Sequence, residues 1–302
     1  MRSNKVHINI SSDHLSAQID PHGAELISLC DAQGAEMMSD GDPAFWSGRA
    51  PLLFPIVGQL RNDEYRLGSK TYSMEKHGFA RRNDFVLREH EAGKAVFTLC
   101  SNDVIKEQYP FDFKLKMTFE IEGNALLKTA EVSNKGADDM PFSFGFHPAF
   151  AWPLPFGDEP FDKAAVDAHK IIFEQDEPAP IRRIGIEPGL IEPMLHDSPV
   201  EGNILSPSYA HFENDAMIWD DLNSRTLTWG DPQKTHLQIE FPDTPWLGLW
   251  QKPRAKYLCI EPWAGMADPV GFDGDFTEKP GMMILAPDES RSFRMNVRLK
   301  EN

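Results

Sequence analysis

The sequence predicts an all-β fold of antiparallel sheets, and three observations carry this prediction. Apolar and polar residues alternate in several segments, helical patterns are few and short, and no β-α-β rhythm is present. Alternation indicates strands with one buried and one solvated face, which is typical of antiparallel sheets. Gly and Pro, with 21 and 24 residues, together exceed their average usage of about 12%, as expected for many strands joined by turns.

The first segments in chain order predict one strand and one short helix. Residues 6–10 alternate between apolar and polar side chains directly after the N-terminus, so we expect a strand there. Asn102 and Asp103 precede residues 104–108 in a pattern typical of a capped helix of one or two turns. Pro110 marks the end of that helix.

Strict alternation at residues 113–122 is the clearest strand signal. The apolar side chains that share one face of this strand are Phe113, Leu115, Met117, Phe119 and Ile121. The same period of two recurs at residues 237–241 and 293–299. The continuous apolar run at residues 257–260 predicts a buried strand.

Residues 153–207 differ from the rest of the chain because they contain nine prolines. Proline removes a backbone donor and is excluded from the middle of a sheet. A separate domain is one interpretation, but the apolar content is thin, so we expect a long excursion of loops and short strands off the main sheets. Residues 1–302 are therefore predicted to form a single domain.

Charge and cysteine content limit the possible partners. The formal net charge of −17 disfavours binding to nucleic acid or to an anionic membrane and favours a neutral ligand. Three widely spaced cysteines without metal-type spacing, Cys30, Cys100 and Cys259, predict reduced thiols. No apolar segment reaches the length of a signal h-region or a membrane span. We expect a cytoplasmic protein, monomeric or homodimeric.

Three ionisable residues in apolar or glycine-flanked surroundings are the candidates for chemistry. His77 precedes Gly78, His147 lies in an aromatic-rich stretch, and Glu261 stands at the end of the apolar strand 257–260. Burying such groups is unfavourable unless they are paired or used. Two imidazoles and a carboxylate form an acid/base set. The structural alternatives are a surface-loop histidine, a core histidine bonded to a backbone carbonyl, and a glutamate paired with an arginine.

Other site chemistries fit the sequence less well. The three candidates are separated by 70 and 114 positions and include no His-x-His pair, so we expect no metal and no cofactor. A glycosidase needs a pair of carboxylates. That option stays open through Glu261 with Asp215, Asp220 or Asp221.

Tryptophans near these motifs agree with a carbohydrate ligand. They are Trp46, Trp250 and Trp263. Each indole could stack on the apolar face of a sugar, or pack in the core as any single tryptophan commonly does.

Four motifs in this order resemble the aldose 1-epimerase (galactose mutarotase) superfamily, particularly its LacX-like bacterial branch. They are Phe54–Gly58 (FPIVG), His77–Arg81 (HGFAR), Gly145–Phe150 (GFHPAF) and Glu261–Trp263 (EPW). The resemblance runs from Gly23–Leu26 to the final strand and covers nearly the whole chain. The combination is specific, although no single motif would be.

The resemblance implies a large antiparallel β-sandwich with an open sugar-binding cleft, and an isomerase that interconverts the anomers of a monosaccharide. Carried over motif by motif, His147 would be the general acid and Glu261 the general base. His77 would hold the sugar and polarise its ring oxygen. Acid and base open the ring, the C1–C2 bond rotates and the steps reverse, so neither cofactor nor metal is required.

Substrate contacts are expected at Gln59, Arg61, Arg81, Asp215 and Trp250. Gln59 departs from the arginine that relatives usually carry after the glycine of the first motif, and this exchange is not conservative. The sequence therefore does not determine which sugar is the substrate. One alternative is a hexose-6-phosphate 1-epimerase, whose phosphate would need the basic residues Arg61, Arg81 and Arg82. Another is a carbohydrate-binding or sensing protein of the same fold without turnover.

Overall fold

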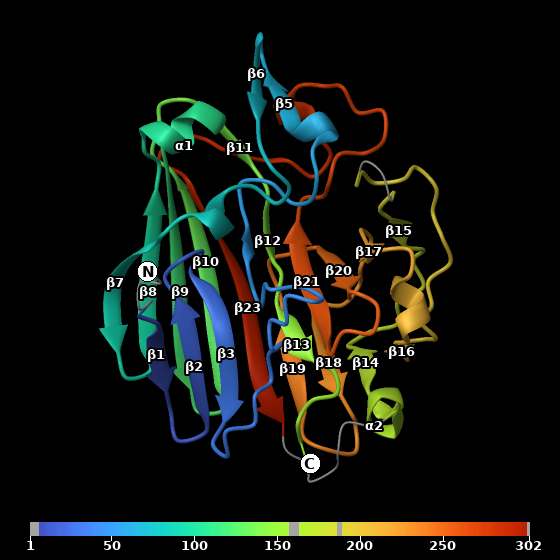
Figure 1. Cartoon of the computed structure of the whole chain (residues 1–302). Coiled ribbons are helices and arrows are strands. Elements are labelled where there is room, and N and C mark those ends of the chain that lie inside the picture. The colour runs from blue at the N-terminus through green and yellow to red at the C-terminus, as the bar shows by residue number, and fades with distance from the viewer. Residues whose placement is uncertain (1–5, 157–162, 186–188, 301–302) are drawn as a thin grey trace.

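The structure, a computed structural model, describes residues 6–156, 163–185 and 189–300. Two large antiparallel sheets pack against each other in it (Figure 1). In the core between them, the ring of Phe144 stacks on that of Phe293 from the other sheet, with centroids 4.8 Å apart. The predicted antiparallel β-sandwich is confirmed.

The nine-stranded sheet contains the clearest strands of the sequence. Its spatial order is β16 (Ile204–Leu205), β14 (Lys170–Phe173), β18 (Thr226–Gly230), β19 (His236–Glu240), β23 (Ser290–Lys300), β10 (Ala125–Asn134), β9 (Phe113–Glu122), β8 (Lys94–Cys100) and β7 (Val86–Glu91). The predicted strands at 113–122, 237–241 and 293–299 are β9, β19 and β23. Buried residues alternate with more exposed ones along the whole of β9, as its pattern predicts.

The seven-stranded sheet contains Glu261 and the two strands that flank His147. Its main order is β15 (Arg182–Arg183), β17 (Met217–Trp219), β20 (Trp246–Trp250), β21 (Tyr257–Ala264), β12 (Phe144–Phe146) and β4 (Leu52–Leu53), and β13 (Ala149–Ala151) also pairs with β21. The apolar run at 257–260 is only the first half of β21. Glu261 therefore lies inside the strand, and its predicted place at the strand end is wrong.

The remaining elements are short. A three-stranded sheet is formed by β1 (Ile8–Ser11), β2 (Leu15–Asp20) and β3 (Glu25–Asp31), and two-stranded pairs by β5 (Glu64–Leu67) with β6 (Lys70–Ser73) and β11 (Met140–Phe142) with β22 (Met283–Leu285). The helices are α1 (Asp103–Gln108) and α2 (Lys163–Ala168), and the 3₁₀ turns are η1 (Arg61–Asp63), η2 (Ala80–Arg82), η3 (Tyr209–Phe212) and η4 (Phe276–Glu278). The Asn102 side chain accepts a hydrogen bond from the Ile105 N–H, which confirms the predicted cap.

The proline-rich residues 153–207 are more closely joined to the sheets than expected. β14 and β16 extend one edge of the nine-stranded sheet, and β15 forms an edge of the seven-stranded sheet. Short edge strands leave one side unpaired, so nearby prolines remove no ladder hydrogen bond there. Pro160 and Pro188 lie outside the described residues.

All three cysteines are free thiols. Among the described residues, the helices are too short and too polar to cross a bilayer.

Candidate active site

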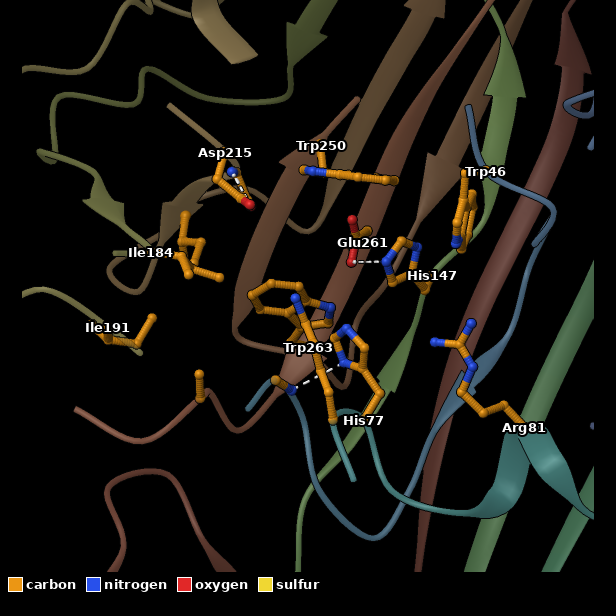
Figure 2. Close-up of a pocket in the computed structure, with 15 residues that line it drawn as sticks. Trp46, His77, Arg81, His147, Ile184, Ile191, Asp215, Trp250, Glu261 and Trp263 are labelled. Atoms are coloured by element: carbon orange, nitrogen blue, oxygen red, sulfur yellow. Dashed lines mark hydrogen bonds and ion pairs between the residues drawn. The ribbon is translucent and has the colours of Figure 1, made fainter. Parts of the chain in front are cut away.

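A cavity of about 180 Å³ brings together most of the predicted site residues (Figure 2). The predicted residues in its walls are His77, Arg81, His147, Asp215, Trp250 and Glu261, joined by Trp46 and Trp263. Ligand pockets for drug-sized molecules commonly measure about 300–1,000 Å³, so this cavity suits one small molecule. Residues distant in sequence meet here because strands from several parts of the chain pair in one sheet.

Alternation along β21 aims Glu261 into the cavity. Leu258 and Ile260 belong to the main core between the sheets, whereas Cys259 and Trp263 pack in small clusters on the opposite face. Because the side-chain period of a strand is two, Glu261 shares the face of Cys259 and Trp263. Figure 2 shows its carboxyl group pointing toward His147. The strand places the carboxyl group on the cavity floor.

The register of the sheet places His147 opposite Glu261. Gly145 of β12 pairs with Trp263, and Ala149 of β13 pairs with Cys259, so the residue midway between them faces Glu261. His147 Nε2 lies 3.1 Å from Glu261 Oε2, and the two side chains are 7% and 2% exposed. The predicted acid and base are therefore in direct contact, and each is the other's partner in a buried setting.

Burial favours the neutral form of both members of this pair. It is the main cause that lowers the pKa of His147 well below its usual range, and Arg81 acts in the same direction. Burial also raises the pKa of Glu261 well above its usual range, while Lys76 opposes this by favouring the carboxylate. A neutral imidazole beside a neutral carboxyl group shares one transferable proton. Such a pair can accept a proton at one atom and release one at the other.

His77 is held in place by two hydrogen bonds to Gly58. The backbone N–H of His77 donates to the Gly58 carbonyl at 2.9 Å, and the Gly58 N–H donates to Nδ1 of His77 at 3.0 Å. Because Nδ1 accepts, the proton of the neutral imidazole is on Nε2. Burial, with His147 as a second cause, lowers the pKa of His77. His77 therefore presents a neutral N–H donor.

The backbone at His77 explains the glycine that follows it. His77 and Gly78 have φ values of 67° and 71°, a conformation that glycine adopts readily and other residues rarely. A Cβ at Gly78 would lie 2.3 Å from the carbonyl oxygen of Phe54. Only glycine fits at position 78, so Gly78 is a requirement of this turn.

Two tryptophans enclose His147. The ring centroid of Trp46 lies 4.8 Å from that of His147 and 5.6 Å from that of Trp250, which crosses it edge to face. These indoles exclude water from the acid/base pair and supply flat apolar surface.

The third tryptophan, Trp263, covers two glycines of the neighbouring strands. A Cβ built on Gly145 of β12 or on Gly248 of β20 would come within 2.7 Å of the indole. Both positions are glycine because the ring occupies the space of a side chain. Trp263 Nε1 is buried, and its N–H lies close enough to Glu261 to favour the carboxylate and so lower the pKa of that group against burial.

Charged side chains complete the cavity wall. Arg81 and Asp215 line it as predicted, and Lys76 lines it too. Burial lowers the pKa of Arg81, and Asp215 accepts a hydrogen bond from the Ala216 N–H at 2.7 Å. Sequence reasoning missed Lys76, whose only signal was its position directly before His77.

Gln59 and Arg61, which the sequence predicted as substrate contacts, do not line this cavity. The backbone turns at Gly58, where φ is 75°, and leads the following residues away. The Gln59 amide then donates to the Asp63 carboxylate. Arg61 lines a separate cavity and donates to the Phe272 carbonyl at 3.4 Å.

The three arginines considered for a phosphate do not converge either. Arg82 pairs with Glu75 at 2.8 Å near the surface, and Arg61 belongs to the separate cavity. Arg81 is the only one of the three that lines the candidate site.

One group of side chains approaches the geometry of a metal site. Ligand atoms of His147, Cys259 and Glu261 lie within 4.8 Å of one another. Metal ligands must be deprotonated, yet burial, with Glu261 as a second cause, raises the pKa of the Cys259 thiol. His147 Nδ1 also lacks a hydrogen-bond partner among the described residues, although a ligating histidine commonly has one. These residues do not fit a resident metal ion.

Known proteins resemble this chain along nearly its whole length. The sequence model described as aldose 1-epimerase matches residues 6–298. Protein LacX of Lactococcus lactis subsp. lactis is 29% identical over 289 residues, which cover 93% of this chain and 95% of LacX.

Solved structures agree with this match. A galactose mutarotase related enzyme from Lactobacillus acidophilus superposes with a TM-score of 0.87 at 29% identity, covering 98% of both chains. A galactose mutarotase-like protein from Lactobacillus casei superposes with a TM-score of 0.88 at 29% identity, covering 98% of this chain and 100% of that one.

Proposed function

The chain belongs to the aldose 1-epimerase family, and from this and the site we propose that it interconverts the α and β anomers of a monosaccharide. The observation that carries the proposal is the 3.1 Å contact between His147 Nε2 and Glu261 Oε2 on the cavity floor. Mutarotation removes a proton from the anomeric oxygen O1 and adds one to the ring oxygen O5. Both oxygens are bonded to C1, so the acid and the base must be neighbours, as these two residues are.

In the proposed reaction, one proton enters and one leaves the pair. The pair carries one proton, and the reaction starts when that proton has passed from Glu261 to His147. The Glu261 carboxylate takes the O1 proton, the C1–O5 bond breaks as the C1–O1 double bond forms, and His147 gives its proton to O5. The open-chain aldehyde rotates about C1–C2. Glu261 then returns its proton to O1 and His147 recovers one from O5 as the ring closes on the other face, so both groups are restored within one turnover.

The surrounding residues bind and orient the sugar. The Nε2–H of His77 is the donor proposed to hold the ring oxygen, since Gly58 occupies its Nδ1. Trp46 and Trp250 present flat apolar surface beside the pair, suited to a pyranose face. Arg81 and Asp215 supply a charged donor and an acceptor for hydroxyl groups.

The cavity favours a sugar without phosphate over the hexose-6-phosphate alternative. Of the three arginines that such a substrate would use, Arg81 alone lines the cavity. A phosphate commonly binds to several convergent donors. Of the basic side chains in the described chain, the wall gathers Arg81 and Lys76, without Arg61 and Arg82. A sugar-binding protein without turnover is the remaining alternative, and it is distinguished by measuring turnover.

The test is anomer exchange followed by NMR over a panel of free and phosphorylated aldoses. We expect exchange with the wild type and a loss of about 10²-fold or more in Glu261→Gln, which keeps the side-chain volume and removes the base. Glu122→Gln, an exposed carboxylate at the end of β9, is the matched control and should exchange normally.

Two outcomes would contradict the proposal. Near-normal exchange in folded Glu261→Gln would remove Glu261 from the mechanism. Sugar binding without any exchange by the wild type would identify a binding protein instead. Thermal unfolding of each variant shows whether it is folded.

A further inference from the structure

Lys76 is a cation of the cavity wall without an assigned role. It directly precedes His77 and lines the same cavity as Glu261. Its side chain is partly buried, and in the described part of the chain it takes part in neither a salt bridge nor a side-chain hydrogen bond. A lysine that approaches an acid/base pair in this way acts on the pair through its charge.

The titratable groups around the His147–Glu261 pair come from four parts of the described chain. They are Lys76, His77 and Arg81 from one segment, Asp215 from the loop before β17, Tyr257 and Cys259 from β21 itself, and Lys128 of β10, which lines a second small cavity with His147. Burial favours the neutral forms of His77, Tyr257, Cys259 and Lys128, because it disfavours the charged form of each. Among the described residues, the charges that line the candidate cavity with the pair are therefore those of Lys76, Arg81 and Asp215.

We propose that Lys76 is a positioning residue of the catalytic centre, whose ammonium group holds the His147–Glu261 pair in the form that carries one proton. The inference rests on the proposed function. A second proton on the pair would leave an imidazolium beside a neutral carboxyl group, in a cavity that already contains Lys76 and Arg81. Like charges repel strongly where water is scarce, so Lys76 drives that second proton off.

The direction of its influence is the same on all three candidate residues. Lys76 favours the neutral imidazole of His77 and of His147, so it lowers the pKa of both. It also favours the carboxylate of Glu261 and is the largest influence that lowers the pKa of that group against burial. One cation therefore prepares both the acid and the base.

The predicted consequence is a shift along the pH axis. A pair that works only with one proton has a bell-shaped rate profile, whose two limbs report the loss of each proton. Lys76→Met removes the cation and keeps the side-chain length, so the pair binds both protons more tightly. Both limbs should then move to higher pH. A merely structural defect would lower the whole profile without moving it.

The experiment measures kcat/KM for anomer exchange across pH in the wild type, Lys76→Met and Lys76→Arg. On the acidic limb we expect a loss of about tenfold in Lys76→Met, as is common when a nearby opposite charge is removed, with recovery on the alkaline side. Lys76→Arg should keep the wild-type profile because it keeps the charge. Lys70→Met, which removes an exposed lysine of β6, controls for the change in net charge.

An NMR titration of the His147 ring nitrogens, without sugar, gives a readout independent of activity. The protonation midpoint should rise in Lys76→Met and stay in place in the Lys70→Met control. An unchanged protonation midpoint of His147 in Lys76→Met, or a rate lowered equally at every pH, would overturn the role of Lys76. Either result would leave His147 as the proposed acid and Glu261 as the proposed base. If the wild type shows no exchange at all, the proposed function fails, and the titration still decides about Lys76. Lys76→Gln replaces Lys76→Met if the latter does not fold.

Discussion

Replacing Lys128 by methionine should stabilise the protein, because Lys128 is a buried lysine with neither an ion pair nor a side-chain hydrogen bond among the described residues. Lys128 lies in β10 between the core residues Leu126 and Ala130 and is 3% exposed. Its ammonium group lies over the ring of Phe146, with the nitrogen 5.2 Å from the ring centroid. Burial lowers the pKa of Lys128 from 10.5 to about 7.

The magnitude follows from that pKa. One pKa unit corresponds to about 1.4 kcal/mol, so burying this lysine costs about 5 kcal/mol at pH 7, less what its contact with Phe146 returns, up to about 2 kcal/mol. Methionine has a similar length and is apolar, so it fits the same space. We expect the unfolding free energy to rise by about 3–5 kcal/mol. A chain of this size gains about 2 °C per kcal/mol, so the Tm should rise by about 6–10 °C.

The effect should depend on pH in a defined direction. The folded-state pKa is lower than the unfolded-state pKa, so between about pH 7 and pH 10.5 the unfolded chain holds a proton that the folded chain lacks. The unfolding free energy of the wild type therefore rises with pH in that window, because the unfavourable contribution of Lys128 becomes smaller. The advantage of Lys128→Met should be largest at pH 7 and below and should shrink as the pH approaches 10.5.

The assay is thermal unfolding followed by circular dichroism at several pH values. Lys114→Met on the solvent side of β9 is the matched control and should change the Tm little. A Tm for Lys128→Met at or below the wild-type value at pH 7, or a difference that does not vary with pH, would show that Lys128 is solvated or paired and refute the reasoning.

Further predictions address the metal, position 59 and the cavity floor. Exhaustive chelation should leave both activity and Tm unchanged, since the buried thiol and carboxyl group favour their protonated forms; activity lost to a chelator and restored by one divalent ion would contradict this. Gln59→Arg should alter kcat/KM for plain aldoses by less than about twofold, because Gln59 lies outside the cavity; a tenfold gain would place it in the site. Gly248→Ala should displace Trp263, raise KM and lower the unfolding free energy by about 1–3 kcal/mol. The control Gly93→Ala, whose added Cβ would have its nearest neighbour at 3.4 Å, should change neither KM nor stability. Equal behaviour of the two variants would show that the indole has room to move.

Local patterns in the sequence were sufficient for the strands with a clearly alternating or apolar pattern. Alternation at 113–122 and 293–299 predicts β9 and β23 because one buried face leaves a period of two in any strand. The capped helix at 103–108 was equally legible, since an N-cap side chain bonds within its own turn. Such signals depend on neighbours in the chain and need no knowledge of the partner strand.

The candidate site could be predicted only in part. The motifs around His77, His147 and Glu261 named the acid/base residues, and the structure brings all three to one cavity with Arg81 and Asp215. Gln59 and Arg61, which do not line the cavity, follow a turn at Gly58 whose direction no local pattern reports. Proximity along the chain was a poor guide to proximity in space.

What the sequence by itself determined is the acid/base set of His77, His147 and Glu261 and the strands with a clear alternating pattern. The tertiary structure alone decided that His147 meets Glu261 across β12, β13 and β21, that Lys76 joins them, and that Lys128 is buried with no ion pair among the described residues. The physical reason is that strand pairing is set by hydrogen-bond register between segments far apart in the chain, and a shift of one residue would turn each side chain to the other face. This register brings His147 Nε2 and Glu261 Oε2, which belong to separate motifs, to a distance of 3.1 Å.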